Sequence, residues 1–369
     1  MDTATEHIKY VKSLDMPLSE AVTLPAHFYS DKDIYNIEID KIWSHSWQLV
    51  TQTSQIKNSG DFVTVRVGEF EVIVLRDTKC KVRAFVNVCR HRGATLIRER
   101  AGTGLKRIVC PFHSWCYDLD GDLVTARSVK HINRADWRLD ELAVEVSRGL
   151  VFVNPDRKAA PFVPQIAAFL ERIKPYPLEE LANAHRMVST VNANWKIVLA
   201  TFNECYHCDG VHHEFSRVMM NGDSDLTGPP VFGGWQTIRP EFNTLTVLGT
   251  TTRASFEALS VNDSRRVYGY CLYPSNYFVL APDYVLLTQF VPNGPEETIV
   301  VDELMLKSEH PFEDIVDFWN ISNDQDWQMC ELVQRGARHG YRRGPYSEEE
   351  SITHDSERWY AQLMKNGSE

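Results

Sequence analysis

Two short stretches decide the fold of this sequence, CRHRG at residues 89–93 and CPFHSW at residues 110–115. Each stretch places a cysteine shortly before a histidine and follows an apolar run that is typical of a strand. Two thiolates and two imidazoles on two facing loops can hold a 2Fe-2S cluster, with cysteines on one iron and histidines on the other. The pattern therefore predicts an iron-sulfur site in a β domain.

Structural zinc is the alternative interpretation, because Cys2His2 is also a zinc ligand set. Zinc sites usually combine a Cys-x2-Cys pair with a separate histidine pair, whereas each stretch here contributes one residue of each kind. Both stretches closely resemble the cluster-binding loops of Rieske oxygenases. The resemblance implies one set of cluster ligands, Cys89, His91, Cys110 and His113. We expect Cys116 to be a strand residue facing the core and Cys80 to be buried.

The segments around these stretches have the period-two pattern of antiparallel strands. Residues 62–88 contain FVTVRV, a Gly-Glu-Phe turn, EVIVLRD and VRAFVNV, which are rich in β-branched residues. GLVFVN at residues 149–154 predicts one further strand, after which three prolines interrupt the pattern. We therefore expect an all-β Rieske iron-sulfur domain over residues 43–158.

The rest of the chain alternates between helical and strand-like patterns. DIYNIEIDKIW at residues 33–43 has helical spacing of its isoleucines, so residues 1–42 are expected to form an N-terminal helical segment that packs on the second domain. The second domain is expected over residues 159–369. Its predicted elements are a helix from Trp195 to about Tyr206, strands within 277–292 and 298–306, and helices at 311–336 and 348–364. The fold class is α+β, and the resemblance implies a helix-grip catalytic domain with an antiparallel sheet flanked by helices.

A second candidate metal site lies in this domain at His207 and His212. On a continuous helix a five-residue step turns by about 140°, so the two side chains share a face only if the helix breaks between them. We expect Gly210 to supply that break. Two imidazoles and one carboxylate leave open positions on an iron for dioxygen, as in non-haem Fe(II) oxygenases. Spacing alone leaves four acidic residues of the late helix open as the third ligand, Asp317, Asp324, Asp326 and Glu331.

The resemblance covers this second site as well. NECYHCDGVHHEF at residues 203–215 resembles the mononuclear iron segment of the family, and QDWQMCE at residues 325–331 resembles the segment that supplies the carboxylate. It implies iron ligands at His207, His212 and Asp326, with His213 as the alternative to His212. Histidines that only satisfy core hydrogen bonds would explain an isolated residue, but a cluster site in the same chain favours a metal.

The resemblance also implies how the two sites cooperate. A Rieske cluster carries one electron at a time, so the chain needs a flavin or ferredoxin-type reductase that draws on NAD(P)H. In the family, subunits form a head-to-tail homotrimer, and a carboxylate before the first iron histidine bridges the cluster of one subunit to the iron of its neighbour. Here that carboxylate is Glu204, where many ring dioxygenases have Asp; a capping or solvated glutamate is the alternative. Asn203 is expected to lie just outside the iron ligands.

Composition agrees with an enzyme that acts on a small molecule. The 369 residues are 43% hydrophobic and carry a formal charge of -11, which argues against a nucleic-acid surface. No apolar stretch approaches the ~18 residues of a membrane span, and residues 1–22 contain no apolar signal region. We therefore expect a cytoplasmic protein whose eight cysteines are ligands or buried thiols rather than a disulfide framework.

The Glu-Cys-Tyr-His variant and GWQTIR at residues 234–239 most resemble the branch of the family that oxidises quaternary ammonium compounds such as choline, carnitine, glycine betaine or proline betaine. This implies a monooxygenase, an oxidoreductase that consumes dioxygen and hydroxylates a carbon next to nitrogen, leading to N-demethylation or C–N cleavage. Candidate aromatic faces for such a cation are Trp235, Tyr270 and Tyr284. The alternatives are a Rieske oxygenase that hydroxylates or O-demethylates an aromatic compound, and a non-enzymatic iron-sulfur or zinc protein.

Overall fold

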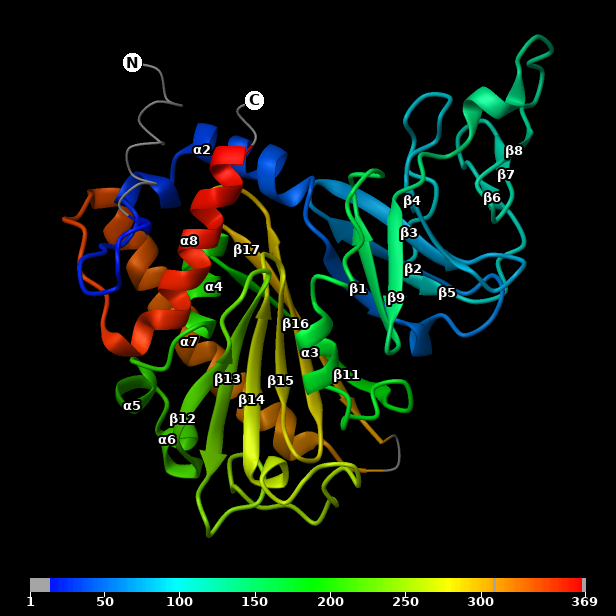
Figure 1. Cartoon of the computed structure of the whole chain (residues 1–369). Coiled ribbons are helices and arrows are strands. Elements are labelled where there is room, and N and C mark those ends of the chain that lie inside the picture. Colours follow the sequence, from blue (N-terminus) through cyan, green and yellow to red (C-terminus); the bar gives the residue numbers. More distant parts are fainter. Residues whose placement is uncertain (1–13, 308–309, 367–369) are drawn as a thin grey trace. The chain divides into compact units, whose positions relative to one another are not determined.

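The computed structural model describes residues 14–307 and 310–366, which divide into two compact units (Figure 1). The first, here called the β unit, consists of Trp43–Gln165 and Leu178–Glu180. The second, here called the α+β unit, consists of the residues up to Ile42, Ile166–Pro177 and the residues from Leu181 onward.

The β unit extends past residue 158, where the first domain was expected to end. The indole of Trp47 stacks on Phe162 with ring centroids 5.8 Å apart. The carboxylate of Glu145 accepts hydrogen bonds from the backbone N–H groups of Phe162 (2.9 Å) and Val163 (2.8 Å). These contacts hold the segment after residue 158 on the β unit, although its prolines prevent it from continuing a strand.

Three small antiparallel sheets make up the β unit. Their strand orders are β4-β3-β2-β5, β6-β7-β8 and β1-β10-β9. The strands are β1 Gln48–Gln52, β2 Phe62–Val67, β3 Phe70–Arg76, β4 Val82–Val86, β5 Ala101–Gly102, β6 Ile108–Val109, β7 Cys116–Tyr117, β8 Leu123–Thr125, β9 Ala143–Ser147 and β10 Leu150–Asn154. Short 3-10 helices lie at η3 Thr53–Gln55 and η4 Arg134–Trp137. The strands expected within 62–88 and at 149–154 are therefore present.

Strand β3 shows why this unit has two cores. Successive side chains of a strand point to opposite faces of its sheet. Ile73 and Leu75 belong to one buried cluster, which also contains Cys89 and Cys110. Val72 and Val74 belong to a second cluster on the other face. The loops that carry the predicted cluster ligands thus rest directly on a hydrophobic core.

The α+β unit is built on one antiparallel sheet of seven strands, in the order β11-β17-β16-β15-β14-β13-β12. The strands are β11 Ala182–Val191, β12 Met219–Leu226, β13 Val231–Ile238, β14 Arg266–Leu272, β15 Asn276–Leu280, β16 Val285–Pro292 and β17 Thr298–Leu306. The helices are η1 Ala26–Tyr29, α2 Lys32–Glu38, η2 Ile39–Trp43, α3 Ala167–Arg172, α4 Trp195–Phe202, α5 Cys208–Val211, α6 His213–Val218, η5 Asp263–Arg265, α7 Glu313–His339, η6 Glu348–Glu350 and α8 Ser351–Asn366. The α+β fold class is confirmed, with a sheet that helices flank on both faces (Figure 1).

The two faces of this sheet have different helical partners. Tyr277 on β15 packs against Phe202 of α4, with ring centroids 5.3 Å apart, and α7 packs beside α4. Tyr270 on β14 packs against Phe169 of α3, with ring centroids 5.7 Å apart. We call these the α4/α7 face and the α3 face. Because side chains alternate along each strand, adjacent residues of one strand lie on opposite faces of the sheet, and every second residue lies on the same face.

A buried ion pair ties the described part of the N-terminal segment to the α+β unit. Lys196 of α4 donates to Glu38 Oε1 (2.6 Å), and the hydroxyl of Tyr360 on α8 donates to the same oxygen (2.8 Å). All three side chains are buried. Breaking such a pair leaves an uncompensated charge in the interior, so these bonds hold α2, α4 and α8 together. No described helix combines the length and the apolar character needed to cross a bilayer.

Candidate functional site

The β unit presents two similar turns that carry the predicted cluster ligands. Gly93 N donates to Cys89 O (3.0 Å), and Ser114 N donates to Cys110 O (3.1 Å). Both turns end in the left-handed region, with φ of 72° at Gly93 and 58° at Ser114. The two cysteines are buried, whereas His91 is exposed. Each turn therefore offers a thiol from the interior and an imidazole from nearer the solvent.

These four side chains fit a cluster with two different irons. The rings of His91 and His113 lie with centroids 4.8 Å apart, and the Cys89 thiol lies next to Cys110. His113 Nδ1 is buried and has no hydrogen-bond partner among the described residues. A buried ring nitrogen without a partner costs free energy. An iron ion would use that lone pair, so the orphaned nitrogen is the observation that favours a metal here.

Tyr117 and Trp115 contact the first of the two turns. The Trp115 ring stacks on His91, with centroids 4.8 Å apart and planes 9° apart. The Tyr117 hydroxyl lies 3.4 Å from Cys89 Sγ and accepts a hydrogen bond from Arg90 N (3.2 Å). Burial raises the pKa of Tyr117, which keeps the phenol protonated, so its hydrogen is available to the sulfur. Hydrogen bonds to sulfur ligands are one of the factors that set the potential of an iron-sulfur cluster.

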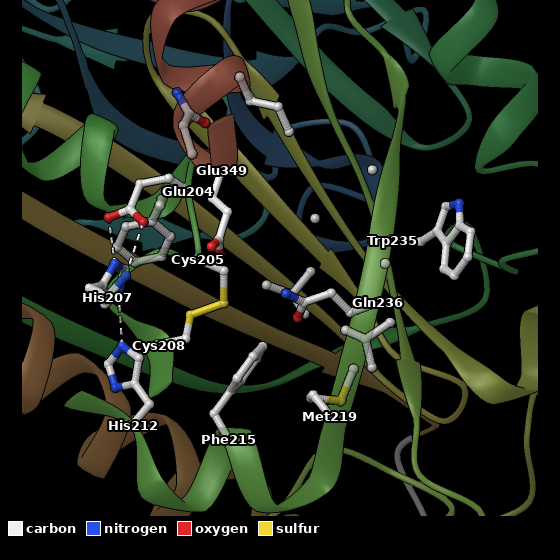
Figure 2. Close-up of a pocket in the computed structure, with 18 of the residues that line it drawn as sticks. Glu204, Cys205, His207, Cys208, His212, Phe215, Met219, Trp235, Gln236 and Glu349 are labelled. Atoms are coloured by element: carbon white, nitrogen blue, oxygen red, sulfur yellow. Dashed lines mark hydrogen bonds and ion pairs between the residues drawn. A yellow bond between two sulfur atoms is a disulfide. The ribbon is translucent and has the colours of Figure 1, made fainter. Parts of the chain in front are cut away.

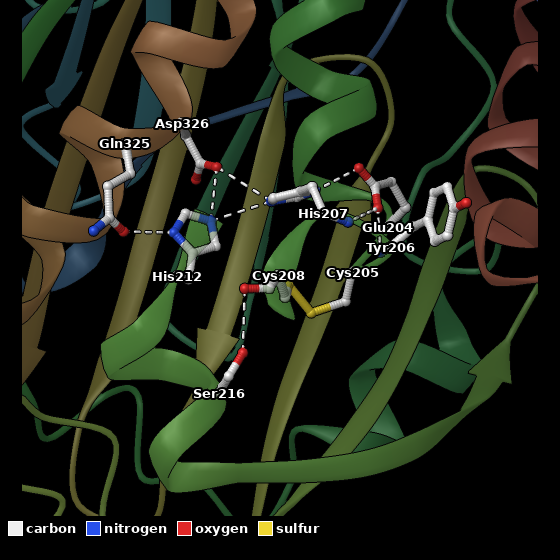
Figure 3. Close-up of a disulfide and its surroundings, with 9 residues drawn as sticks. All are labelled: Glu204, Cys205, Tyr206, His207, Cys208, His212, Ser216, Gln325 and Asp326. Carbon is white, nitrogen blue, oxygen red and sulfur yellow. Dashed lines mark hydrogen bonds and ion pairs between the residues drawn. A yellow bond between two sulfur atoms is a disulfide. The ribbon is translucent and has the colours of Figure 1, made fainter. Parts of the chain in front are cut away.

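The α+β unit brings together three further ligand types at His207, His212 and Asp326. Asp326 Oδ1 lies 2.9 Å from His212 Nε2 and 3.3 Å from His207 Nε2, and the two Nε2 atoms are 3.1 Å apart (Figure 3). First-row divalent metals such as zinc hold imidazole nitrogen at about 2.1 Å, so two ligands at right angles are about 3 Å apart. The three atoms have the spacing of one face of an octahedral site, as in the two-histidine, one-carboxylate arrangement.

The outer hydrogen bonds turn the lone pairs of both histidines inward. His207 Nδ1 donates to Glu204 Oε1 (2.5 Å), and His212 Nδ1 donates to Gln325 Oε1 (2.7 Å). Each ring then keeps its lone pair on Nε2, facing the other ring and the Asp326 carboxylate. Three acceptors this close repel one another unless a positive charge lies between them. The arrangement therefore fits a bound metal ion.

The pKa shifts have the same electrostatic cause. Burial lowers the pKa of His207, but hydrogen bonds to Asp326 and Glu204 outweigh it and raise that pKa to about 9. Burial raises the pKa of Asp326, but its hydrogen bonds to the two histidines outweigh burial and lower it. The site thus favours one negative carboxylate and one positive charge between the rings, and a metal dication satisfies the same requirement.

The break that aligns the two histidines differs from the one expected at Gly210. Gly210 lies inside the short helix α5, and the chain leaves the helical conformation at His212, with φ -108° and ψ 78°. Helix α6 then starts at His213, which is exposed and does not join the triad. His212 itself occupies the junction between the two short helices α5 and α6, so its side chain can turn back toward His207.

Glu204 is folded onto its own loop. Its Oε2 accepts hydrogen bonds from the backbone N–H groups of Tyr206 and His207 (3.2 Å for His207), while Oε1 binds the His207 ring. Its side chain is mostly buried at 14% exposure, whereas the neighbouring Tyr206 is 60% exposed. The backbone contacts of the capping alternative and the contact to the His207 ring are therefore both present in one side chain. Glu204 thus orients the His207 ring from within the same chain.

A disulfide joins Cys205 to Cys208 and closes the loop that contains His207 (Figure 3). The expectation that all eight cysteines are ligands or thiols is therefore wrong for this pair. A Cys-x-x-Cys spacing at residues 205–208 was the sequence signal, but this spacing encloses His207, which favoured an interpretation as a metal site. Cys80 also differs from expectation, because it is exposed in the turn after β3 rather than buried; Cys116 is half-buried on β7.

Two residues beside the ligands complete the surroundings of the triad. Gln325 holds His212 in place and lies next to Asp326 on α7, a neighbour relation that sequence could have shown. Asn203 follows the last turn of α4, and its amide donates to Ser356 Oγ (3.3 Å). Asn203 is buried and lines the same cavity as His207, His212 and Asp326.

A cavity of about 690 Å³ opens beside the triad within the α+β unit (Figure 2). His207, His212 and Asp326 all belong to its wall. Gly222, Gly234 and Gly269 form part of the sheet floor, where the lack of side chains leaves room. At Gly269 an added Cβ would come 2.2 Å from the Tyr277 hydroxyl. A small organic molecule fits such a space in contact with the triad.

Two of the three predicted aromatic binding residues lie outside this cavity. Tyr270 is fully buried on the α3 face, where its hydroxyl donates to Asp225 (3.0 Å). Tyr284 is fully buried, donates to Leu245 O (2.8 Å) and accepts a hydrogen bond from Trp319 Nε1 (3.1 Å). Tyr284 therefore supports a cavity residue from behind and does not itself face the space.

Trp235 borders the cavity through its strand, but its ring is turned away. It pairs in register with Tyr268, which stacks on Tyr270 of the α3 face. Figure 2 shows the indole on the opposite side of β13 from Gln236. The guanidinium of Arg266 lies 3.6 Å from its ring centroid, so a cation of the chain itself already covers one face. The alternation of side chains along β13 and β14 explains why the rings of Trp235 and Tyr270 point away from the cavity.

Four other aromatic residues supply the rings on the cavity side, Phe202, Phe215, Tyr277 and Trp319. Helical spacing could have revealed two of them. Trp319 lies two turns before Asp326 on α7, and Phe215 lies three residues after His212. This spacing places Trp319 on the same face of α7 as Asp326, and it places Phe215 in the first turn after the junction at His212.

Comparison with known proteins agrees with the two units. The profile of the Rieske [2Fe-2S] domain matches residues 46–136, and that of the ring hydroxylating alpha subunit (catalytic domain) matches residues 178–366. The chain is 26% identical to the glycine betaine monooxygenase oxygenase subunit of Pseudomonas aeruginosa, over 93% of this chain and 89% of that protein. It is 28% identical to the carnitine monooxygenase oxygenase subunit of Acinetobacter baumannii, over 87% of each.

A solved structure has the same fold over nearly the whole chain. A quaternary ammonium Rieske monooxygenase in complex with an inhibitor superposes with a TM-score of 0.83 at 23% identity, covering 97% of this chain and 98% of that chain. Both predicted cofactors, a Rieske 2Fe-2S cluster and a mononuclear non-haem iron, are those of the matched families. The chain is an oxidoreductase that belongs to the ring hydroxylating alpha subunit family of Rieske oxygenases.

Proposed function

We propose that this protein is the oxygenase component of a multicomponent monooxygenase that hydroxylates a small quaternary ammonium compound, with electrons from NAD(P)H supplied by a flavin or ferredoxin-type reductase. The observation that carries the proposal is the close triad of His207, His212 and Asp326 in the wall of a cavity with aromatic sides. The glycine betaine and carnitine monooxygenase subunits to which the chain is similar support the substrate class.

In this proposal Cys89, His91, Cys110 and His113 bind the cluster, and His207, His212 and Asp326 bind the single iron. The two cofactors supply electron transfer and dioxygen activation. Glu204 and Gln325 keep a proton on Nδ1 of each iron histidine, so that Nε2 stays a ligand. The backbone N–H groups of Tyr206 and His207, within the loop that the disulfide closes, hold the Glu204 carboxylate in position, and Asn203 lies beside this loop.

The aromatic wall has the role of binding the substrate cation. Phe202, Phe215, Tyr277 and Trp319 present rings to the cavity, and a quaternary ammonium group is attracted to the face of such rings. Held there, the carbon next to nitrogen lies near the triad. Hydroxylation of that carbon gives a product that loses the nitrogen substituent, so the outcome is N-demethylation or C–N cleavage.

The reaction also requires partners outside the chain. A cluster passes one electron at a time, so the reductase must deliver electrons repeatedly. We place the enzyme in the cytoplasm, where NAD(P)H is available, as a head-to-tail homotrimer. Glu204 then bridges an iron histidine of its own subunit to a cluster histidine of the neighbour, which its position on the ring of His207 supports.

Substrate-dependent NADH consumption with a surrogate reductase tests this function. Quaternary ammonium compounds should stimulate consumption and formaldehyde or aldehyde release, whereas aromatic acids and aryl ethers should not. His207→Ala should abolish turnover and keep the Rieske EPR signal. Stimulation by aromatic compounds alone would contradict the proposed substrate class, and a wild-type protein without a Rieske EPR signal would contradict the enzyme class.

A further inference from the structure

The charged side chains of the cavity are all of one sign, apart from the two iron histidines. Among the described residues that line it there is no Lys or Arg, and the acidic members are Glu204, Asp209, Asp223, Asp326 and Glu349. Glu204 and Asp326 are already engaged with the histidines. Three carboxylates therefore remain to be considered as neighbours of a substrate.

Their positions are not equivalent. Asp223 lies opposite Trp235 in the register of β12 and β13, on the strand side that faces away from the triad, and its carboxylate accepts from Ser224 N (2.8 Å). Asp209 is exposed in α5. Glu349 is exposed in η6, and Figure 2 shows its side chain extending toward the Cys205–Cys208 disulfide. In the described part of the chain Glu349 forms no salt bridge, so its charge faces the cavity uncompensated.

The arginines on neighbouring segments are occupied elsewhere. Arg217 donates to Val247 O, and Arg239 donates to Ser216 O (3.3 Å). Arg265 donates to backbone carbonyl groups (2.6 Å to Arg239 O), and Arg266 covers the ring of Trp235 on the α3 face. None of these four arginines belongs to the cavity wall. A carboxylate in this cavity would therefore lose its water without gaining a Lys or Arg side chain as a partner.

We infer that the substrate is a cation without a carboxylate group, a quaternary or tertiary alkylammonium compound bearing a neutral polar tail, and that Glu349 selects for it at the rim. This inference rests on the proposed function and narrows its substrate class. The aromatic rings hold the cationic nitrogen, and uncharged groups such as Gln236 and Ser322 are available to a hydroxyl or amide tail. A betaine carboxylate meets the uncompensated carboxylate of Glu349 at the rim instead, which repels it.

A matched pair of probes separates the charge of the tail from its size. Glycine betaine and its amide differ only in whether the tail is a carboxylate or a neutral amide of the same shape, and choline adds a neutral alcohol. Binding to the fully metallated enzyme, measured anaerobically by titration calorimetry, should be about tenfold tighter for the amide than for glycine betaine. Equal or tighter binding of glycine betaine overturns the inference and leaves the proposed function standing. If none of the three binds and aromatic compounds do, the proposed function itself fails.

Glu349→Lys and Glu348→Lys form a matched pair of variants. Both residues lie in the first turn of η6 and are exposed, so each substitution changes the helix end equally, but only Glu349 lines the cavity. Glu349→Lys should lower the preference for the amide over glycine betaine at least about threefold, because it places a cation where the carboxylate tail lies. Glu348→Lys should leave it unchanged. If both variants shift the preference equally, or neither does, Glu349 is not the selecting residue.

Discussion

The two metal sites differ in how far apart along the chain their ligands lie. The proposed cluster ligands come from two short turns, each of which carries one cysteine and one histidine and is closed by its own backbone hydrogen bond. The proposed iron ligands come from a helix junction and from α7, and two of them, His212 and Asp326, are 114 residues apart. The first site is shaped mainly by local turns. The second site forms only when α7 packs against the sheet in the position that brings Asp326 to the two histidines.

This difference determines which changes elsewhere in the chain disturb each site. A turn that is closed locally tolerates changes elsewhere, whereas a site shared between distant elements depends on everything that positions those elements. Asn323, one turn before Asp326 on α7, donates to Asp302 of β17 (2.9 Å) in the buried interior. Contacts of this kind make the iron site dependent on the sheet.

The largest expected effect is the separate loss of each metal. Asp326→Ala should remove the mononuclear iron and reduce turnover by about a thousandfold or more, because the facial triad loses its only carboxylate. Cys110→Ser should remove the cluster, because a thiolate ligand is lost. Iron analysis with EPR spectroscopy measures both.

If the two sites are independent, each variant should keep the other metal. The Rieske signal should be unchanged in Asp326→Ala, and about one iron per chain should remain in Cys110→Ser. Loss of both metals in either variant would show that the two sites are not separable in this way.

Glu204→Gln tests the residue proposed to connect the two sites. The amide still accepts a hydrogen bond from His207, so both metals should stay bound, while turnover should fall about a hundredfold because the charged bridge is lost. Glu204→Asp should recover part of the rate. An unchanged rate in Glu204→Gln would remove the bridging role and leave Glu204 as a support for His207.

Asp302 provides a pH-dependent test of the α7 contact. Burial raises the pKa of Asp302 to about 6, against 3.8 for a free Asp, although hydrogen bonds from Thr288 and Asn323 oppose the shift. Since the folded state prefers the protonated form, its stabilising contribution is complete below pH 3.8 and is lost as the pH rises through 6. Asp302→Asn should therefore raise the free energy of unfolding at pH 8 by up to about 3 kcal/mol.

Denaturant unfolding between pH 4 and 8 checks this expectation. The difference between Asp302→Asn and the unmodified protein should grow as the pH rises through 6. Parallel pH curves would show that Asp302 does not titrate in this range. A destabilised variant at pH 8 would mean that the carboxylate, rather than its protonated form, holds α7.

Removal of the Cys205–Cys208 disulfide tests how much this cross-link stabilises the loop that contains His207. The disulfide closes a four-residue loop, and removing such a cross-link should lower the free energy of unfolding by about 2 kcal/mol. Replacing both cysteines by serine measures the effect, and reduction of the unmodified protein with a phosphine should reproduce it. The Rieske EPR signal serves as the control, because neither cysteine is a cluster ligand. An unchanged midpoint after reduction would contradict the expectation.

The smallest expected effect concerns the cluster potential. Tyr117→Phe removes the hydroxyl next to Cys89 Sγ, and a hydrogen bond worth about 1 kcal/mol corresponds to about 40 mV for one electron. The potential should fall, because a hydrogen bond to sulfur stabilises the more negative reduced cluster. A redox titration followed by EPR measures the change. A potential that stays the same would show that the hydroxyl does not bond to the sulfur.

Sequence reasoning succeeded where the structure is local. The strands expected within residues 62–88, the strand at 149–154 and the helices at 311–336 and 348–364 correspond to β2 to β4, β10, α7 and α8. It also indicated His207 and His212, since two histidines in one short segment can meet if the helix between them breaks. It placed that break at Gly210, because glycine is the usual helix breaker, whereas the chain breaks at His212.

The aromatic candidates failed for a reason of geometry. Trp235 and Tyr270 lie on neighbouring strands of the sheet, but strand periodicity alone does not say which face carries the iron. Once α4 and α7 are placed, Trp235 and Tyr270 fall on the α3 face, and Trp319 and Phe215 fall on the cavity side. The sequence did not indicate Glu349, because an exposed run of acidic residues at the start of a helix contains nothing that shows whether a cavity lies beside it.

The sequence by itself predicted the fold class and singled out the two Cys/His turns and the pair His207 and His212, because spacing within a turn or a short segment defines each of these patterns. Asp326 was one of four acidic residues on α7 until family resemblance singled it out, and the structure brings it within 2.9 Å of His212. Only the tertiary structure decided which face of the sheet bounds the cavity, which rings line it and that its wall has no Lys or Arg among the described residues. These properties depend on how α7, η6 and the seven-stranded sheet pack, and packing brings together residues that no local pattern connects.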